Sequence, residues 1–88
     1  MDILEKSFET SVNIVSNLSS RPSDDELLKI YGYYKQSTIG NITTSEPNLL
    51  NVKARKKWNA WNDVKNMDKK IAMQNYINYT MNLYKKYN

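Results

Sequence analysis

The sequence predicts an all-α fold, a four-helix bundle formed by a single domain over residues 1–88. Apolar residues recur at spacings of three and four rather than two, which is the period of an amphipathic helix. Only two glycines and two prolines are present, so few residues suit the tight turns of β-hairpins. A chain of this length lies near the lower limit at which one hydrophobic core supports a fold.

The first helix is expected over residues 3–18. Its apolar face is formed by residues at helical spacing: Leu4, Phe8, Val12, Val15 and Leu18. Pro22 follows shortly afterwards, and the residue before a proline is displaced from the helical region. The first helix should therefore end before this proline.

The second helix is expected to begin near residue 24. Ser23 followed by Glu26 has the spacing of a capping box, and residues 24–26 place negative charge at the positive end of the helix dipole. Gly40 is the predicted stop, because glycine readily adopts the left-handed conformation that ends many helices.

A long connection, residues 41–50, separates the second helix from the third. It is rich in asparagine, threonine and serine and contains Pro47. A connection of this length allows the third helix to run parallel to the second instead of folding straight back. Asn51 is the expected N-cap of a third helix over residues 52–65.

Asp68 is expected to cap a fourth helix that continues to about residue 86. The inner stripe of this helix consists of apolar and aromatic residues with one threonine: Ile71, Ala72, Tyr76, Ile77, Thr80, Leu83, Tyr84 and Tyr87.

The charge is unevenly distributed along the chain. Residues 1–46 carry four basic and seven acidic side chains, a net −3, whereas residues 47–88 carry nine basic and two acidic, a net +7. A positive half of a small domain attracts anions, although a solvated lysine-rich surface has the same composition. The charged N-terminus resembles no signal peptide, and no apolar run approaches the roughly 20 residues that span a bilayer, so we expect a soluble cytoplasmic protein.

The composition argues against an enzyme and against a metal site. The chain has no histidine and no cysteine, so it lacks the usual general base, a disulfide and a thiolate zinc ligand. The only carboxylate cluster, residues 24–26, sits where a helix start favours it and lacks metal-ligand spacing. We expect no catalytic residue, no metal and no cofactor.

The segment from Tyr31 to Gly40 holds the first candidate binding residues. Tyr31, Tyr34 and Lys35 fall at i, i+3 and i+4, so two phenol rings and one ammonium group share a helix face. The tyrosines alone are typical of core packing. The lysine beside them favours a site for a planar, anionic and partly apolar ligand.

Basic and aromatic residues also alternate in the third helix. Lys53 and Lys57 lie four residues apart, so their ammonium groups point the same way and repel each other unless an anion lies between them. Phosphate is the usual biological anion for such a pair. Trp58 and Trp61, by contrast, are expected to pack in the core.

These segments together resemble the acyl-CoA-binding protein family, and the resemblance covers essentially the whole chain. The matching stretches are Tyr31-Gly-Tyr-Tyr-Lys-Gln-Ser-Thr-Ile-Gly40, Glu46-Pro47, Lys53-x-x-x-Lys57-Trp58-x-Ala60-Trp61-Asn62 and Ala72-Met73-x-x-Tyr76-Ile77.

The resemblance implies an up-down-down-up bundle that binds one long-chain acyl-CoA ester without reacting on it. The implied ligand-binding residues are Tyr31, Gly32, Tyr33, Tyr34, Lys35, Lys53, Lys57 and Tyr76. Among them, Lys35 and Lys57 would meet the phosphates, Tyr31 the adenine, and the hydroxyl of Tyr76 the same head group.

The resemblance also implies an acyl channel, whose candidate residues fit pure core packing equally well. These candidates are Phe8, Val12, Val15, Leu27 and Leu28. One departure concerns Ser16, which stands where the family often has a lysine for the ligand. Gly32 lies inside the second helix at a cost of up to ~1 kcal/mol relative to alanine. A close approach of the ligand to the backbone would explain it, and so would neutral drift.

The function expected from the resemblance is that of an intracellular acyl-CoA carrier and pool buffer. Such a protein would be monomeric, would bind no nucleic acid and would contact membranes at most transiently. Two other classes fit parts of the sequence. A basic nucleic-acid-binding module is consistent with a pI near 9.3 and clustered basic and aromatic residues, and a helical scaffold would use the tyrosines to anchor a protein partner.

Overall fold

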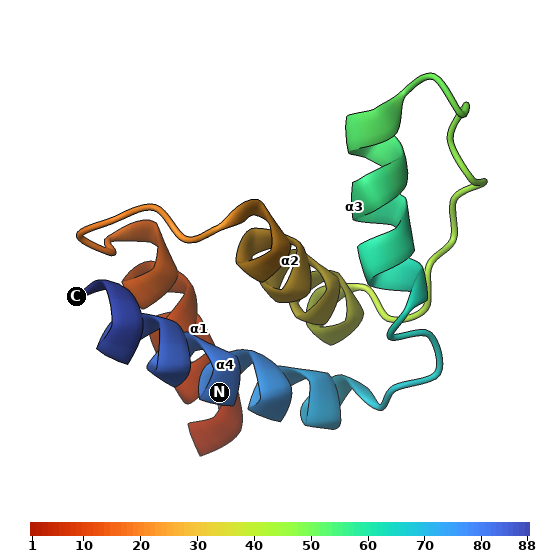
Figure 1. Ribbon diagram of the computed structural model, residues 1–88. Helices are drawn as coiled ribbons and strands as arrows, with labels where there is room; N and C mark the ends of the chain where they lie inside the picture. The colour runs from red at the N-terminus through yellow and green to blue at the C-terminus, as the bar shows by residue number, and fades with distance from the viewer.

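The computed structural model describes all 88 residues and contains helices and no strand (Figure 1). The helices are α1 (Ile3–Ser16), α2 (Asp24–Thr38), α3 (Val52–Asn62) and α4 (Lys69–Tyr87). The predicted all-α fold is therefore confirmed. None of the helices is long and apolar enough to cross a membrane.

Helix α3 ends three residues earlier than the sequence predicts. The chain turns after Asn62, and Asn66 adopts a left-handed conformation with φ of 72°. Asparagine tolerates this conformation better than most residues, so the turn can form there. The predicted end of α1 is similarly two residues too late.

The predicted caps are present at the helix ends. The Ser23 hydroxyl accepts a hydrogen bond from the Glu26 amide at 3.2 Å, and the Glu26 carboxylate accepts one from the Ser23 amide at 2.9 Å. Asn51 and Asp68 cap α3 and α4 with their side chains. Gly40, with φ of 102°, lies just after the end of α2. The starts of α2, α3 and α4 could therefore be predicted from local residue patterns.

Contacts between the helices fix their directions. Glu26 near the start of α2 meets Lys86 near the end of α4, and Tyr33 meets Tyr79, so α2 and α4 are antiparallel. Phe8 of α1 packs on Tyr76 of α4, while Ser19, after α1, bonds Asn88 at the end of the chain. Helices α1 and α4 therefore run in the same sense.

Helices α2 and α3 also run in the same sense. Tyr31 faces Lys57 and, four residues further on in both helices, Lys35 faces Trp61. The bundle thus has the up-down-down-up order, and the long connection between α2 and α3 returns the chain to the starting end.

The core lies between α1, α2 and α4. Its buried members are Phe8, Ile30, Tyr76 and Leu83. Helix α3 packs against α2 and against no other helix, which leaves it set apart from α1 and α4 (Figure 1).

Of the two tryptophans of α3, Trp61 is buried and Trp58 is half-buried. The indole of Trp61 donates a hydrogen bond to the carbonyl of Gly40 at 2.7 Å, and that of Trp58 donates to Thr44 at 3.0 Å. The expected core packing is found for Trp61, whereas for Trp58 the expectation was wrong, because this side chain lies half-buried against the connecting loop.

Candidate ligand-binding site

A cleft of about 670 Å³ lies between α2 and α3. It is lined by Arg21, Asp24, Leu27, Leu28, Tyr31, Val52, Lys53, Lys56 and Lys57. This volume falls within the range of small-molecule sites, roughly 300–1,000 Å³. Because α2 and α3 run side by side, residues that are distant in sequence line the same cleft.

Positive charge gathers on the α3 side of the cleft. Lys53 and Lys57 lie one helical turn apart, with Lys56 between them, and all three are exposed. The ammonium nitrogen of Lys57 lies 4.9 Å from the ring centre of Tyr31. Lysines on one face without a carboxylate among them favour a bound anion.

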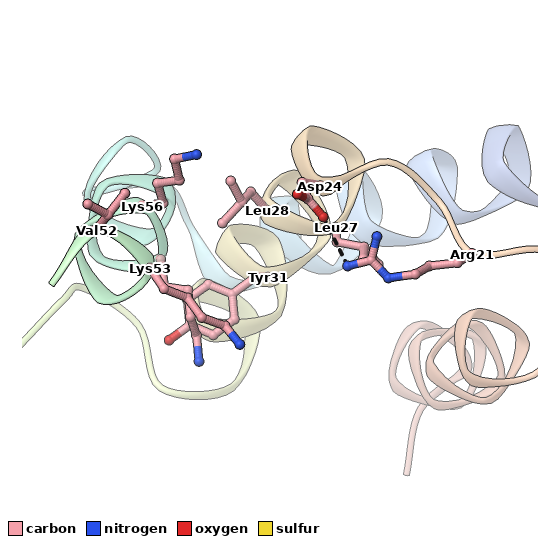
Figure 2. A pocket seen from close by; sticks show the side chains of 9 residues that line it. Arg21, Asp24, Leu27, Leu28, Tyr31, Val52, Lys53 and Lys56 are labelled. Carbon is pink, nitrogen blue, oxygen red and sulfur yellow. Dashed lines mark hydrogen bonds and ion pairs between the residues drawn. The ribbon is translucent and has the colours of Figure 1, made fainter.

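The rest of the cleft is apolar and ends at an ion pair. Leu27 and Leu28 lie on the α2 wall, and Figure 2 shows them between the lysines of α3 and Arg21. Arg21 donates to the Asp24 carboxylate at 2.9 Å. An anionic group bound among the lysines can thus continue into an apolar chain along the leucines.

A second aromatic group lies between α1, α2 and α4. Phe8 stacks on Tyr34 with ring centres 6.0 Å apart, and Tyr34 is 6.2 Å from Tyr76. Phe8 and Tyr34, together with Val12, help to line a shallower hollow of about 530 Å³. Tyr34 is 40% exposed and can meet a ligand from this side.

Tyr76 is only 2% exposed. Burial, with a contribution from neighbouring Tyr34, raises the pKa of Tyr76 to about 12. The phenol therefore keeps its proton at any physiological pH and remains a hydrogen-bond donor.

The predicted site residues fall into separate groups in the structure. Tyr31, Lys53 and Lys57 meet in the cleft between α2 and α3, together with Leu27 and Leu28. Tyr34 and Tyr76 belong to the second aromatic group, as does the acyl-channel candidate Phe8, and the candidate Val12 lines the hollow beside it. The fifth candidate, Val15, packs against the core.

Three further predicted residues, Gly32, Tyr33 and Lys35, lie outside both hollows. The ammonium of Lys35 lies 4.8 Å from the ring centre of Trp61, one turn beyond Lys57. Tyr33 packs edge-on against Tyr79 at 6.3 Å.

The structure gives Gly32 a reason different from those inferred from the sequence. A side-chain carbon built on this glycine would lie 2.4 Å from the Ala60 carbonyl oxygen. The group that approaches Gly32 is therefore the backbone carbonyl of Ala60 in α3. This corrects the interpretation that a ligand approaches the backbone at Gly32. Glycine lets α2 and α3 cross closely enough to form the cleft.

Four cleft residues were missed by sequence reasoning. Lys56 and Val52 lie in the first half of α3 together with Lys53. This closeness to a predicted binding residue could have indicated that they line the same site. Arg21 and Asp24 looked like parts of a helix break and a helix start. Their place at the end of the cleft depends on tertiary packing, which the pattern does not contain.

Comparison with known proteins identifies the group to which this architecture belongs. The family model for acyl-CoA-binding protein matches residues 5–80. This chain belongs to the acyl-CoA-binding protein family.

Individual members cover almost the whole chain. Acyl-CoA-binding protein 2 of Saccharomyces pastorianus is 44% identical over 80 residues, which are 91% of this chain and 92% of that protein. The Drosophila melanogaster acyl-CoA-binding protein homolog is 38% identical over 97% of this chain and 99% of its own length. The crystal structure of acyl-CoA-binding protein 2 from Oryza sativa superposes with a TM-score of 0.90 at 36% identity, covering 94% of this chain and 90% of the rice protein. The fold and family agree with what the sequence motifs predicted.

Proposed function

We propose that this protein binds long-chain fatty acyl-CoA esters without reacting on them, and that it serves as a cytoplasmic carrier and buffer of the acyl-CoA pool. The observation that carries the proposal is the cleft between α2 and α3. It joins a cluster of lysines beside Tyr31 to an apolar wall, in a family whose members are named for acyl-CoA binding.

The head group of the ligand would lie at the lysine end. Lys53 and Lys57 are placed to form charge-assisted hydrogen bonds to phosphate oxygens, which are stronger than neutral ones. Tyr31 offers a flat ring beside them for the adenine. Lys35, one turn further along, reaches the same region by turning away from Trp61.

The acyl chain would lie against Leu27 and Leu28. Each methylene that leaves water contributes about 0.8 kcal/mol, or roughly fourfold in affinity. Chain burial would therefore dominate the preference for acyl-CoA over free CoA. The Arg21–Asp24 pair stands at the far end of the apolar wall and would mark where burial stops.

The chemistry of the lining suits a carrier. The chain has no histidine or cysteine to attack or hydrolyse a thioester. Tyr76 lines neither hollow, and its pKa is raised to about 12, so its buried phenol keeps its proton and is no nucleophile. A bound ester would be shielded and released unchanged.

Calorimetric titration with palmitoyl-CoA tests the proposal. We expect saturable binding of one ligand per chain, much weaker binding of free CoA, and affinity that rises along the series from octanoyl-CoA through dodecanoyl-CoA. The absence of saturable binding to palmitoyl-CoA would rule the proposal out. Equal affinity for free CoA and palmitoyl-CoA would show that the apolar wall does not bind the acyl chain.

A further inference from the structure

Three exposed apolar side chains stand together where the connecting loop enters α3. Leu49 is 75% exposed, Leu50 is 91% exposed and Val52 is 59% exposed. We call these three residues the loop tip. Single exposed leucines are common on protein surfaces, but three apolar side chains within four positions form a patch that water solvates poorly.

The loop tip is held in this exposed position by hydrogen bonds. The Leu50 amide donates to the Asn48 side chain at 2.8 Å, and the Asn51 amide donates to the Asn48 carbonyl at 2.9 Å. Arg55 donates to the Pro47 carbonyl at 2.8 Å. These bonds define the backbone on both sides of the leucines, so their exposure is a property of the folded loop.

Positive charge follows the loop tip directly. Lys53, Lys56 and Lys57 are exposed, and none of them has a carboxylate within ion-pair distance. The acidic residue of the loop, Glu46, is bound to Arg55 at 2.6 Å, which neutralises it. The loop tip is therefore an exposed apolar patch that is followed by three lysines without acidic partners.

We propose that the loop tip docks this protein onto the surface of an anionic lipid bilayer. Leu49 and Leu50 enter the boundary between head groups and acyl chains, while the lysines contact lipid phosphates. Apolar residues next to lysines are the pattern by which interfacial segments bind membranes. The inference goes beyond the proposed ligand binding, because Leu49 and Leu50 lie outside the cleft, although Val52 and the lysines also line it.

A bilayer fits the loop tip better than a protein partner does. Protein interfaces are anchored by aromatic and arginine side chains seated in pockets. The loop tip is instead aliphatic and is followed by long lysine side chains. The connection that leads into it runs along the outer edge of the molecule beside α3 (Figure 1). Val52 and Lys53 also line the cleft, so docking turns one end of the cleft towards the lipid.

Vesicle flotation of the full chain, without any acyl-CoA, tests the docking. We expect binding to vesicles of phosphatidylcholine with phosphatidylserine, weaker binding to phosphatidylcholine alone, and release by high salt. The double substitution Leu49→Ser and Leu50→Ser should weaken binding to the anionic vesicles by at least about tenfold, since two leucines lose their burial. The matched control is Ile3→Ser, which changes an 85% exposed apolar residue of α1 and should leave vesicle binding unchanged.

Several results would overturn the docking proposal. They are no binding of the unaltered chain to anionic vesicles, equal binding by the double variant, or an equal loss with Ile3→Ser. Self-association that the double substitution abolishes, without vesicle binding, would assign the loop tip to a contact between copies. Neither leucine lines the cleft, so the double variant should still bind palmitoyl-CoA in solution. Failure of docking and failure of ligand binding are thereby distinguishable.

Discussion

The two sides of α2 lie in contrasting surroundings. Towards α1 and α4, Ile30 is 7% exposed and belongs to a core that also buries Phe8, Tyr76 and Leu83. Towards α3, Leu27, Leu28 and Tyr31 are only half-buried and border an open cleft. One helix thus separates a region that holds the fold together from a region that can take a ligand.

The difference shows how a chain of 88 residues combines a core with a binding cleft. Because α3 rests on α2 alone, it can stand away from α4 without opening the core. The side chains of the cleft remain partly solvated, so removing one should cost little folding energy but should remove a contact with the proposed ligand. Changes in the cleft should therefore affect binding, and changes in the core should affect stability.

The largest expected effect is on ligand binding, from the double substitution Lys35→Ala and Lys57→Ala. Hydrogen bonds to charged groups contribute about 1.5–3 kcal/mol each, so palmitoyl-CoA affinity should fall by at least about a hundredfold. The fold should survive, because each lysine gives up only a contact with an aromatic ring. Such a contact is worth about 0.5–1 kcal/mol for exposed Lys57 and up to about 2 kcal/mol for half-buried Lys35.

Calorimetry and urea unfolding measure the two quantities for this variant. Lys85→Ala, an exposed lysine at the far end of α4, controls for loss of net charge and should bind palmitoyl-CoA nearly normally. If the protein were instead a helical scaffold, the calorimetric response to palmitoyl-CoA would change little with either variant. An equal loss with Lys85→Ala would mean that net charge, and not the cleft, attracts the ligand.

The complementary change in the core is Leu83→Ala. Leu83 is 2% exposed, and truncation of such a residue removes buried methyl groups and leaves a cavity. The free energy of unfolding should fall by about 2–3 kcal/mol. Palmitoyl-CoA affinity measured under native conditions should stay within about threefold, a difference of less than ~1 kcal/mol. A large loss of affinity in the folded variant would break the separation between the two sides of α2.

Gly32→Ala probes the junction between α2 and α3 itself. The added carbon would lie 2.4 Å from the Ala60 carbonyl, so the helices must move apart. The strain of about 1–3 kcal/mol is partly offset by the better helix propensity of alanine, which leaves a net loss of roughly 1 kcal/mol. Affinity should also fall several-fold, because the same two helices form the cleft. Gly32→Val should cost more on both counts, and a stabilised Gly32→Ala variant would contradict the close crossing.

Gly32 also illustrates what the sequence could and could not predict. The caps at Ser23, Asn51 and Asp68 were readable because each depends on a residue and its neighbours a few positions away. The reason for Gly32 depends on Ala60, which lies in another helix. Only the crossing of two helices shows that the backbone of α3, and not a ligand, requires the glycine.

The same limit explains why the candidate residues separate in space. Helical spacing places Tyr31, Tyr34 and Lys35 on one side of α2 but does not say which helix each will meet. In the structure Tyr31 meets α3 while Tyr34 meets Phe8 of α1. Similarly, Phe8 and Leu27 are both apolar, and only the packing shows that, of these two residues, Leu27 lines the large cleft and Phe8 does not.

The smallest expected effect concerns the electrostatics that join α2 to α4. Glu26 accepts hydrogen bonds from the Tyr87 hydroxyl and the Ser23 amide, and it pairs with Lys86 at 3.0 Å. The Tyr87 hydrogen bond, followed by that of Ser23, lowers the pKa of Glu26 from 4.5 to about 2. The folded state thus binds the proton more weakly than the unfolded state, so Glu26 stabilises the fold above pH 4.5 and this contribution is lost as pH falls towards 2.

Glu26→Gln should therefore lower the unfolding temperature near neutral pH, and the difference from the unaltered chain should shrink as the solution is acidified through this window. Thermal unfolding followed by circular dichroism across the pH range measures it. Asp25→Asn removes a neighbouring charge from the same helix start without breaking a bond to α4, so it should cause a smaller change. Ligand affinity should be unaffected by either substitution, because neither Glu26 nor Asp25 lines the large cleft. A Glu26→Gln variant that matched Asp25→Asn at every pH would show that only the helix dipole, and not the link between α2 and α4, depends on this carboxylate.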